Sequence, residues 1–353
     1  MSLHEQPLVS VVTPVYNGED FLAECIESIL AQTYPHFEYI IVNNCSTDRT
    51  LQIAKDYAQK DPRIRVHTND AFVGVMENHN IALSLISPQA KYCKVVCADD
   101  FIFPECLAKM VELAEANPSA GLVGSYSIAG KQVIFTGLDY ETKLVNGREL
   151  CRATLLGGPY VFGCPTSLLY RADLIRKTKT FFPSSSPHSD TTACYQSLEH
   201  SDFGFVHQVL SYTRIHAASE SSKSLKYGTI RLSLLSDYCR FAPKYLSPSE
   251  VNLRMGSLVA DYYHALVPTL FEQPGNKEFW QSQKKELQDI GLQFSVARLL
   301  MTGLLRGARL LFLKPGKAVK KLLARKRNAA TIEAKYYEER PGTGGDSGSR
   351  VHV

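Results

Sequence analysis

Short strand-like segments alternate with helical segments through the first 125 residues, and this alternation limits the possible folds more than any other feature. The strand-like segments are rich in β-branched and apolar residues and lie at residues 8–13, 39–42, 64–66, 92–97 and 122–125. Between them, apolar residues recur at helical spacing. Such alternation predicts an α/β fold with a mostly parallel sheet flanked by right-handed crossover helices.

Ligands of parallel α/β sheets bind in the loops beyond the carboxyl ends of the strands. That rule directs attention to residues 13–19, 43–48 and 98–103. Neither GxGxxG nor GxxxxGK[ST] is present after the first strand, which argues against a dinucleotide-binding enzyme and a P-loop NTPase.

The second half of the chain has a different pattern. Strands are expected near residues 131–136, 166–171 and 203–213, with a helix at 190–199. Strand signals then disappear after about residue 225, and helices are expected at 248–262 and 279–289. We therefore expect an α/β domain over residues 1–222, a C-terminal helical extension over 223–338 and a disordered tail over 339–353.

Composition excludes several classes of protein. The formal net charge is only +4, which does not indicate a nucleic-acid partner. The nine cysteines contain no CxxC pair, which favours reduced core thiols over disulfides or structural zinc. No apolar leader occupies residues 1–7 and no stretch of 18 apolar residues exists, so we expect a cytoplasmic protein with no secretory signal and no membrane-spanning helix.

Three loops carry residues suited to a nucleotide and a metal. In the first loop, Pro14 stiffens the strand exit and Tyr16 offers a flat face to a base. In the second, Asn44 has both an acceptor and a donor for a base edge, although the local sequence of residues 43–48 by itself favours an Asx or Ser turn that caps the next helix.

The third loop places Asp99 and Asp100 directly after an apolar strand. Two adjacent carboxylates at a buried strand end repel one another, so a cation would stabilise them. Hard oxygen ligands suit Mg²⁺ or Mn²⁺. The open alternative is a solvated acidic pair before the helix that begins near Pro104.

Together the three loops resemble those of family 2 inverting glycosyltransferases of the GT-A fold. The resemblance covers roughly residues 7–220 and rests on the Val11–Asn17 segment, the Asn43–Asp48 loop and an Ala98-Asp99-Asp100 version of the DxD motif. It implies a nucleotide-binding half at about 7–130 and an acceptor half at about 131–222.

The resemblance also implies roles for individual residues. The nucleotide-sugar-binding residues would be Thr13, Pro14, Tyr16, Asn44, Asn80 and Asp99, the metal ligands Asp100 and His216, and the catalytic base Asp190. Three positions depart from the family pattern: Asn44 replaces an Asp that binds uracil, His79 replaces an Arg, and Ala98 replaces the first Asp of DxD.

Two of these roles have simpler readings. Asp190 in Pro187–Thr192 fits the family's base at a helix start, where the helix dipole keeps a carboxylate ionised, but it could equally be an N-cap. His216 lies in the segment Tyr212–Ser221, which resembles the family's YRxH…S motif. A lone His at a strand exit is more often packed or solvated than a ligand.

A basic amphipathic segment spans residues 296–327. It could lie on an anionic membrane surface, at the inner face of the plasma membrane, or pack on the catalytic domain.

The resulting hypothesis is metal-assisted transfer of a sugar from a nucleotide-diphosphate donor to a glycan or lipid-linked acceptor. The departures at Asn44, His79 and Ala98 keep open a catalytically silent nucleotide-sugar-binding or partner-binding protein. A sugar-phosphate nucleotidylyltransferase is the third possibility, although it would need a basic Gly-rich first loop.

Overall fold

The computed structural model describes residues 6–183, 188–216, 219, 229–272 and 274–313. Contacts divide the chain into two compact units, one extending to Arg214 and the other beginning at Ile215. The domain boundary predicted at residue 222 and the predicted tail at 339–353 fall outside the described residues and stay predictions.

The first unit is built on one mixed sheet. Its strands are β1 (Val9–Val15), β2 (Phe37–Asn43), β3 (Ile64–Thr68), β4 (Tyr92–Val95), β5 (Phe101–Ile102), β6 (Ala120–Ala129), β7 (Gln132–Ile134), β8 (Leu144–Val145), β9 (Leu168–Arg171) and β10 (Asp202–Thr213). The order is β3-β2-β1-β4-β9-β6-β10-β5, with β7 on β6 and β8 on β10. Strands β1 to β4 are mutually parallel, and β9 runs antiparallel between β4 and β6. The predicted mostly parallel α/β sheet is confirmed.

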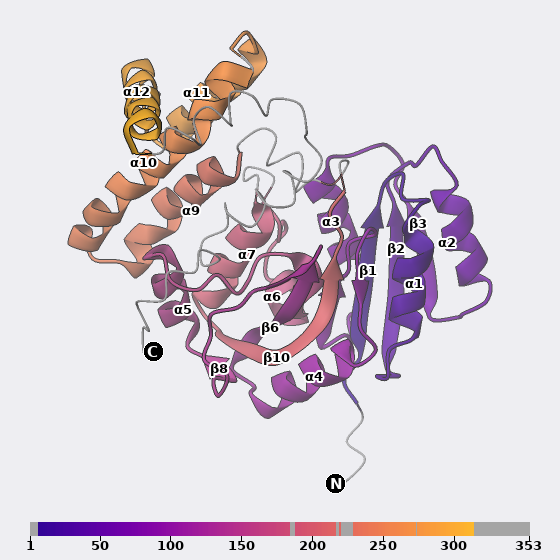
Figure 1. The fold of residues 1–353 in the computed structure, drawn as a ribbon. Helices are drawn as coiled ribbons and strands as arrows, with labels where there is room; N and C mark the ends of the chain where they lie inside the picture. The colour runs from indigo at the N-terminus through magenta and orange to yellow at the C-terminus, as the bar shows by residue number, and fades with distance from the viewer. Residues whose placement is uncertain (1–5, 184–187, 217–218, 220–228, 273, 314–353) are drawn as a thin grey trace. The chain divides into compact units, whose positions relative to one another are not determined.

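Helices connect these strands and cover the sheet (Figure 1). They are α1 (Leu22–Leu30), α2 (Thr50–Ala58), α3 (Val75–Ser84), α4 (Cys106–Ala116), α5 (Gly147–Leu155), α6 (Ala172–Arg176) and α7 (Ser189–Leu198), with a 3₁₀ turn, η1, at Pro165–Ser167. Helix α1 buries Leu22, Cys25, Ile26 and Ile29, one apolar side at helical spacing. All seven residues of β1 are buried, as expected of a central parallel strand.

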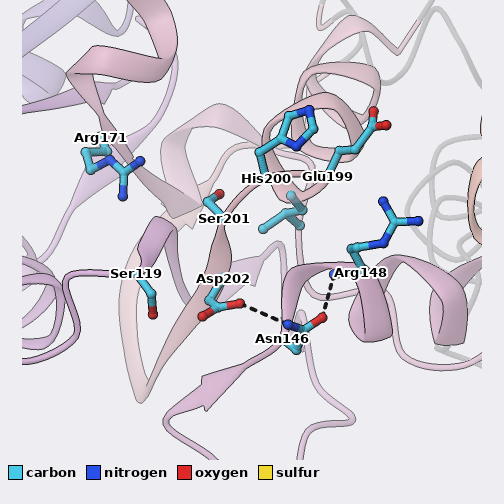
Figure 2. A pocket seen from close by; sticks show the side chains of 9 residues that line it. Ser119, Asn146, Arg148, Arg171, Glu199, His200, Ser201 and Asp202 are labelled. Atoms are coloured by element: carbon cyan, nitrogen blue, oxygen red, sulfur yellow. Dashed lines mark hydrogen bonds between the residues drawn. The ribbon is translucent and has the colours of Figure 1, made fainter.

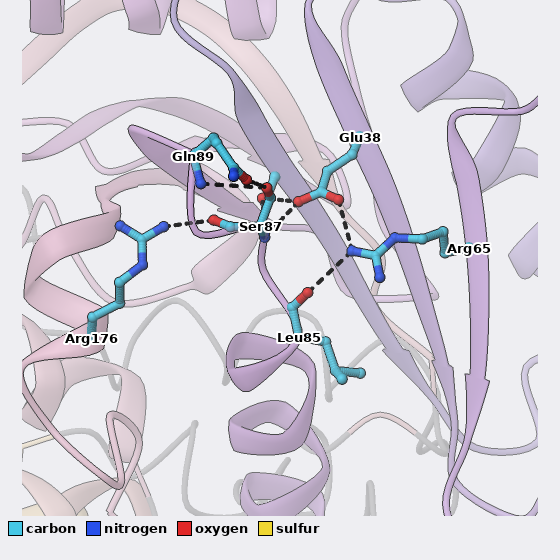
Figure 3. A network of polar contacts seen from close by, with 7 residues as sticks. Glu38, Arg65, Leu85, Ser87, Gln89 and Arg176 are labelled. Atoms are coloured by element: carbon cyan, nitrogen blue, oxygen red, sulfur yellow. Dashed lines mark hydrogen bonds and ion pairs between the residues drawn. The ribbon is translucent and has the colours of Figure 1, made fainter.

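Polar contacts fix the amino ends of the strands (Figure 3). Glu38 accepts from the Ser87 amide at 2.7 Å and from Arg65 Nη2 at 2.7 Å, and it also bonds the Ser10 hydroxyl. Arg176 on α6 donates to the Ser87 carbonyl oxygen at 2.7 Å. This end of the sheet is therefore closed by internal bonds, whereas the loops at the carboxyl ends carry the candidate site.

The second unit is helical, as predicted. It contains α9 (Thr229–Tyr245), α10 (Pro248–Glu272), α11 (Lys277–Asp289) and α12 (Val296–Leu313), and the sequence analysis did not identify α9. Tyr262, Leu266, Phe279, Leu287 and Leu299 belong to its buried core. No helix in the described ranges has the length and apolarity needed to cross a membrane.

All nine cysteines are free, and six of them are buried: Cys25, Cys93, Cys106, Cys151, Cys164 and Cys194.

Two glycines give opposite expectations for stability. A Cβ on Gly147, at the start of α5, would lie 2.0 Å from the Ser201 carbonyl oxygen and 2.5 Å from that of Leu198. Because both are backbone atoms that cannot rotate away, we expect Gly147→Ala to cost about 1–3 kcal/mol. Gly256, inside α10, has nothing within 4 Å of an added Cβ, so Gly256→Ala should gain about 0.5–1 kcal/mol. Urea unfolding followed by circular dichroism measures both, and equal effects would contradict the packing described.

Candidate functional site

The loops after β1 and β2 are bonded to each other at the carboxyl edge of the sheet. Asn17, at φ +48°, accepts from the Thr47 amide at 2.8 Å and donates its own amide to Ser46 Oγ at 3.0 Å. The Gly18 amide donates to Thr50 Oγ1 at 2.8 Å. The two predicted nucleotide loops are thus one rigid surface.

Asn44 joins this surface to the loop after β3. Its Oδ1 accepts from the Val73 amide at 3.0 Å and from Asn69 Nδ2 at 3.0 Å, while its Nδ2 donates to the Val73 carbonyl oxygen at 2.8 Å. The residue is only 2% exposed. A carboxylate at this position could not donate to Val73, which gives the departure from the family's Asp a structural reason.

Two aromatic rings stand at the mouth of these loops. Tyr16 is 48% exposed and lies edge-on to Phe72, with ring centroids 4.8 Å apart. Phe72 is 62% exposed and was not singled out from the sequence. The sequence could have indicated Phe72, because it lies in the loop after the third parallel strand and that loop lies at the carboxyl edge of the sheet with the other two.

An acidic group follows β4. One ligand atom each from Cys97, Asp99 and Asp100 lies within 4.8 Å of the others. The side chain of Ala98 has no atom that could bind a metal. Cys97, two residues before Asp99, has the spacing of the first residue of a D-x-D pair. The sequence analysis placed that first position at Ala98 and overlooked the thiol.

Asp100 is held from two distant segments. It is 4% exposed, and its oxygens accept from Thr166 Oγ1 of η1 at 2.6 Å and from the Arg214 amide after β10 at 2.9 Å. Burial, and then the neighbouring charge of Asp99, raise the pKa of Asp100 well above its usual range. Burial likewise raises the pKa of the Cys97 thiol, with Asp100 adding to the effect.

Arg214 also secures the backbone of this loop. Its Nε donates to the Asp99 carbonyl oxygen at 2.9 Å, and its guanidinium pairs with Glu24 of α1. The same group lies 4.8 Å from the Phe21 ring centroid.

A buried lysine supports the η1 turn. Lys94 in β4 is completely buried, and its Nζ donates to the Thr166 carbonyl oxygen at 2.7 Å. Thr166 Oγ1 in turn accepts from the Cys97 amide at 3.1 Å while it donates to Asp100. Burial lowers the pKa of Lys94. Lys94 therefore holds Thr166 in place, and Thr166 in turn holds the carboxylate of Asp100.

Helix α3 connects the acidic group to the second half of the unit. Burial lowers the pKa of His79, against the opposing influence of the Val75 carbonyl oxygen at 2.8 Å and of the Asp99 charge. Asn80 makes two hydrogen bonds with the backbone of Phe182. Its Nδ2 donates to the Phe182 carbonyl oxygen at 2.8 Å, and its Oδ1 accepts from the Phe182 amide at 2.9 Å. This pairing uses the Asn80 amide that the resemblance assigned to the nucleotide sugar.

The remaining predicted residues are distributed as follows. Asp190 lies in the first turn of α7, half-buried, with Oδ1 accepting from the Thr191 amide at 2.8 Å. His216 belongs to the second unit and is not one of the three residues that form the acidic group. Pro14 and Thr13 are buried in β1. The Thr13 hydroxyl accepts from the Tyr39 hydroxyl at 3.0 Å, so we place its side chain in the core and leave it out of the site.

A separate pocket of about 320 Å³ lies at the other edge of the sheet (Figure 2). It is lined by residues at the starts of β6 and β10, including Ser119 and Asp202. Its charged groups are already partnered, since Arg171 bonds Asp173 at 2.6 Å and Asp202 accepts from the Gly147 amide at 3.3 Å. It is not the predicted site.

The donor set fits a divalent cation. Two carboxylates supply hard oxygens suited to Mg²⁺ or Mn²⁺, and a thiol beside them is a softer third donor. Burial and the charge of Asp99 raise the pKa of Asp100, and a bound cation would act on that pKa in the opposite direction.

Comparison with known proteins identifies the family. The profile described as "Glycosyl transferase family 2" matches residues 10–178. An uncharacterized glycosyltransferase of Haemophilus influenzae is 30% identical over 229 residues, which cover 62% of this chain and 84% of that protein. The chain belongs to glycosyltransferase family 2.

Other glycosyltransferases match over shorter spans. A second uncharacterized glycosyltransferase of H. influenzae is 31% identical over 191 residues, 52% of this chain and 58% of that protein. The poly(ribitol-phosphate) beta-glucosyltransferase of Bacillus spizizenii is 29% identical over 185 residues, 50% of this chain and 27% of its own length. The chain thus spans less than two thirds of the first-ranked relative.

Solved structures share the fold. S. aureus TarS 1-349 in complex with UDP-GlcNAc has a TM-score of 0.58 at 18% identity and covers 80% of each chain. The mannosyltransferase PcManGT of Pyrobaculum calidifontis, in complex with GDP-Man and Mn²⁺, has a TM-score of 0.54 at 16% identity, covering 95% of this chain and 86% of its own. These likenesses confirm the predicted GT-A type of fold.

The bonding of Asn44 predicts the behaviour of its neighbours. Asn44→Ala would leave the Val73 amide without its acceptor, and we expect a loss of about 1–3 kcal/mol together with release of the Phe72 loop. Chymotryptic cleavage after Phe72 should then rise at least several-fold, measured by mass spectrometry. Gln52→Ala, an exposed change on α2, is the control and should leave the rate unaltered. An unchanged rate in Asn44→Ala would contradict this bonding role.

Proposed function

We propose that the protein is an inverting glycosyltransferase that moves a sugar from a nucleotide-diphosphate donor to a hydroxyl of a glycan or lipid-linked acceptor. The observation that carries the proposal is the acidic group of Cys97, Asp99 and Asp100 at the carboxyl end of β4. Family 2 membership supplies the reaction class. The exposed pair of Tyr16 and Phe72 supplies apolar faces for the donor's base.

Only some of the residues that the sequence predicted to bind the nucleotide sugar are proposed to contact the donor directly. Tyr16, Phe72 and Asp99 have side chains at least partly exposed at the loops, and Pro14 shapes the strand exit. Asn44 and Asn80 act by holding their loops, because their amides bond the backbones of Val73 and Phe182. Relatives of the fold bind UDP-GlcNAc or GDP-Man, and either nucleotide is compatible with this loop chemistry.

Asp99 and Asp100 are proposed to hold Mg²⁺ or Mn²⁺, with Cys97 beside them. Such a cation, when bound, acts as a Lewis acid that neutralises charge on a departing diphosphate. Asp100 contributes a carboxylate whose direction is already set by Thr166 and Arg214. Asp99 is half-buried, and one of its ligand atoms lies within 4.8 Å of those of Cys97 and Asp100. His216 remains a candidate ligand from the segment after Arg214.

Asp190 is the proposed base. Inversion needs a carboxylate that takes the acceptor proton as the hydroxyl attacks the sugar from the face opposite the leaving group. Asp190 lies in the first turn of α7, where the positive end of the helix dipole favours a negatively charged side chain. The segment before α7 is tied to α3 by the pairing of Asn80 with Phe182, next to His79, on which the Asp99 charge acts. The Asn80–Phe182 pairing supports the proposal that the base and the metal ligands belong to one centre.

The acceptor is proposed to be a cell-envelope glycan. A relative named poly(ribitol-phosphate) beta-glucosyltransferase and another named as a putative teichuronic acid biosynthesis glycosyltransferase, both from Bacillus, support this class. A cytoplasmic enzyme at the inner face of the membrane would meet both the donor and a lipid-linked acceptor.

A donor panel tests the activity. Release of nucleoside diphosphate from UDP, GDP, CDP and dTDP sugars is measured with Mn²⁺, with Mg²⁺ and with a chelator, alongside thermal shifts that report binding. We expect one nucleotide to stabilise the protein and to be turned over only with metal. Binding without turnover, across acceptors, would instead favour the silent-binder alternative.

Removing the proposed metal ligands separates metal binding from folding. Asp99→Ala should weaken Mn²⁺ binding at least tenfold, measured by electron paramagnetic resonance of free Mn²⁺, because a hard anionic ligand is lost. Asp100→Ala should do the same and also lower the melting temperature, since Thr166 and the Arg214 amide lose their acceptor. Asp289→Ala, an exposed acid on α11, should change neither quantity. Unaltered Mn²⁺ affinity in both site variants would refute the metal assignment.

Replacing the proposed base should affect the chemical step alone. Asp190→Asn should lower kcat about 10²–10⁴-fold, while the Kd for donor changes less than about twofold, because an amide cannot take the proton. Glu199→Gln, at the other end of α7, is the matched control and should retain activity. Nuclear magnetic resonance of the product's anomeric proton reports the stereochemistry. Retention of configuration would contradict the inverting mechanism.

A further inference from the structure

Helix α12 turns its apolar side outward. Val296, Leu300, Met301, Leu304 and Leu305 are all more than half exposed, and Leu304 reaches 71%. These side chains recur at intervals of four and five residues, so they form one continuous side of the helix. We call this surface the α12 apolar face.

The opposite side of α12 packs on α10 with one buried leucine flanked by small and polar residues. Leu299 is buried, and a Cβ on Gly303 would lie 3.9 Å from Val267 Cγ1. Arg306 Nη1 donates to the His264 carbonyl oxygen at 3.0 Å. The helix therefore has apolar residues on both sides, and those on the outer side are left in water. Apolar patches of this kind mark an interaction surface.

The charge around this face has a single sign. Residues 290–332 contain ten Lys and Arg and no Asp or Glu. Arg298 is exposed on α12 itself, and seven of the ten basic residues follow the helix, from Lys314 to Arg327. An apolar face in a segment whose sequence carries only positive charge is complementary to a surface that offers both apolar chains and anionic groups.

We propose that the α12 apolar face binds the surface of an anionic lipid bilayer, with the helix lying in the plane of the interface. The exposed leucines and Met301 would enter the acyl boundary while arginine and lysine side chains contact acidic headgroups. A second copy of this chain fits the charge less well, because its own α12 surface would bring the same positive sign. The inference concerns only the second unit and does not depend on sugar transfer.

Vesicle flotation of the full chain tests the proposal. We expect binding to vesicles of phosphatidylcholine with 30% phosphatidylglycerol, at least tenfold weaker binding to phosphatidylcholine alone, and a marked decrease at high salt. Leu300→Glu/Leu304→Glu should reduce binding to the anionic vesicles at least tenfold. Both positions are exposed, so the fold should survive, which circular dichroism verifies.

The matched control is Leu253→Glu, at an 84% exposed leucine on α10 outside the α12 apolar face. It should bind vesicles like the wild type. Equal flotation of the double variant and the wild type, or no flotation of either, overturns the proposal. So does concentration-dependent dimerisation that the double variant abolishes without any vesicle binding by the wild type, because the occupant would then be a second copy.

Discussion

The buried carboxylate of Asp100 is the interaction on which the arrangement of the site depends. One oxygen accepts from Thr166 of η1 and the other from the amide of Arg214, so residues 66 and 114 positions away converge on one side chain. Lys94 Nζ donates to the carbonyl oxygen of Thr166 and so stabilises the position of this residue. Because these groups are buried, their bonds are costly to break and keep the loop after β4 in one conformation.

The sequence was sufficient for the architecture and for the edge where the loops meet. Alternating strand and helix signals predict parallel order, and parallel order alone brings the segments around Asn17, Thr47 and Asp99 to one end of the sheet. The observed bond between Asn17 and the Thr47 amide is one result of that convergence. Family resemblance then supplied the reaction class, which no spacing could have given.

Side-chain direction was the part that the sequence could not supply. Both faces of β1 are buried, so the alternation of polar and apolar residues that would orient Thr13 is missing, and its hydroxyl lies in the core. The partners of Asn80 and Asp100 lie 102, 66 and 114 residues away, beyond any local pattern. In α12, periodicity indicated an apolar helix face but could not tell which residues would pack inward: Leu299 is buried, whereas Leu300 and Leu304 are exposed.

Arg214 has a further consequence as the last residue of the first unit. The chain passes into the second unit at Ile215, one peptide bond beyond an amide that is bonded to Asp100 and a guanidinium that is bonded to the Asp99 backbone and Glu24. Any tension along that covalent connection reaches the carboxylate loop before it reaches the rest of the sheet. Arg214 therefore anchors the carboxylate loop through three bonds, and a movement passed along the chain at Ile215 would act on that loop first.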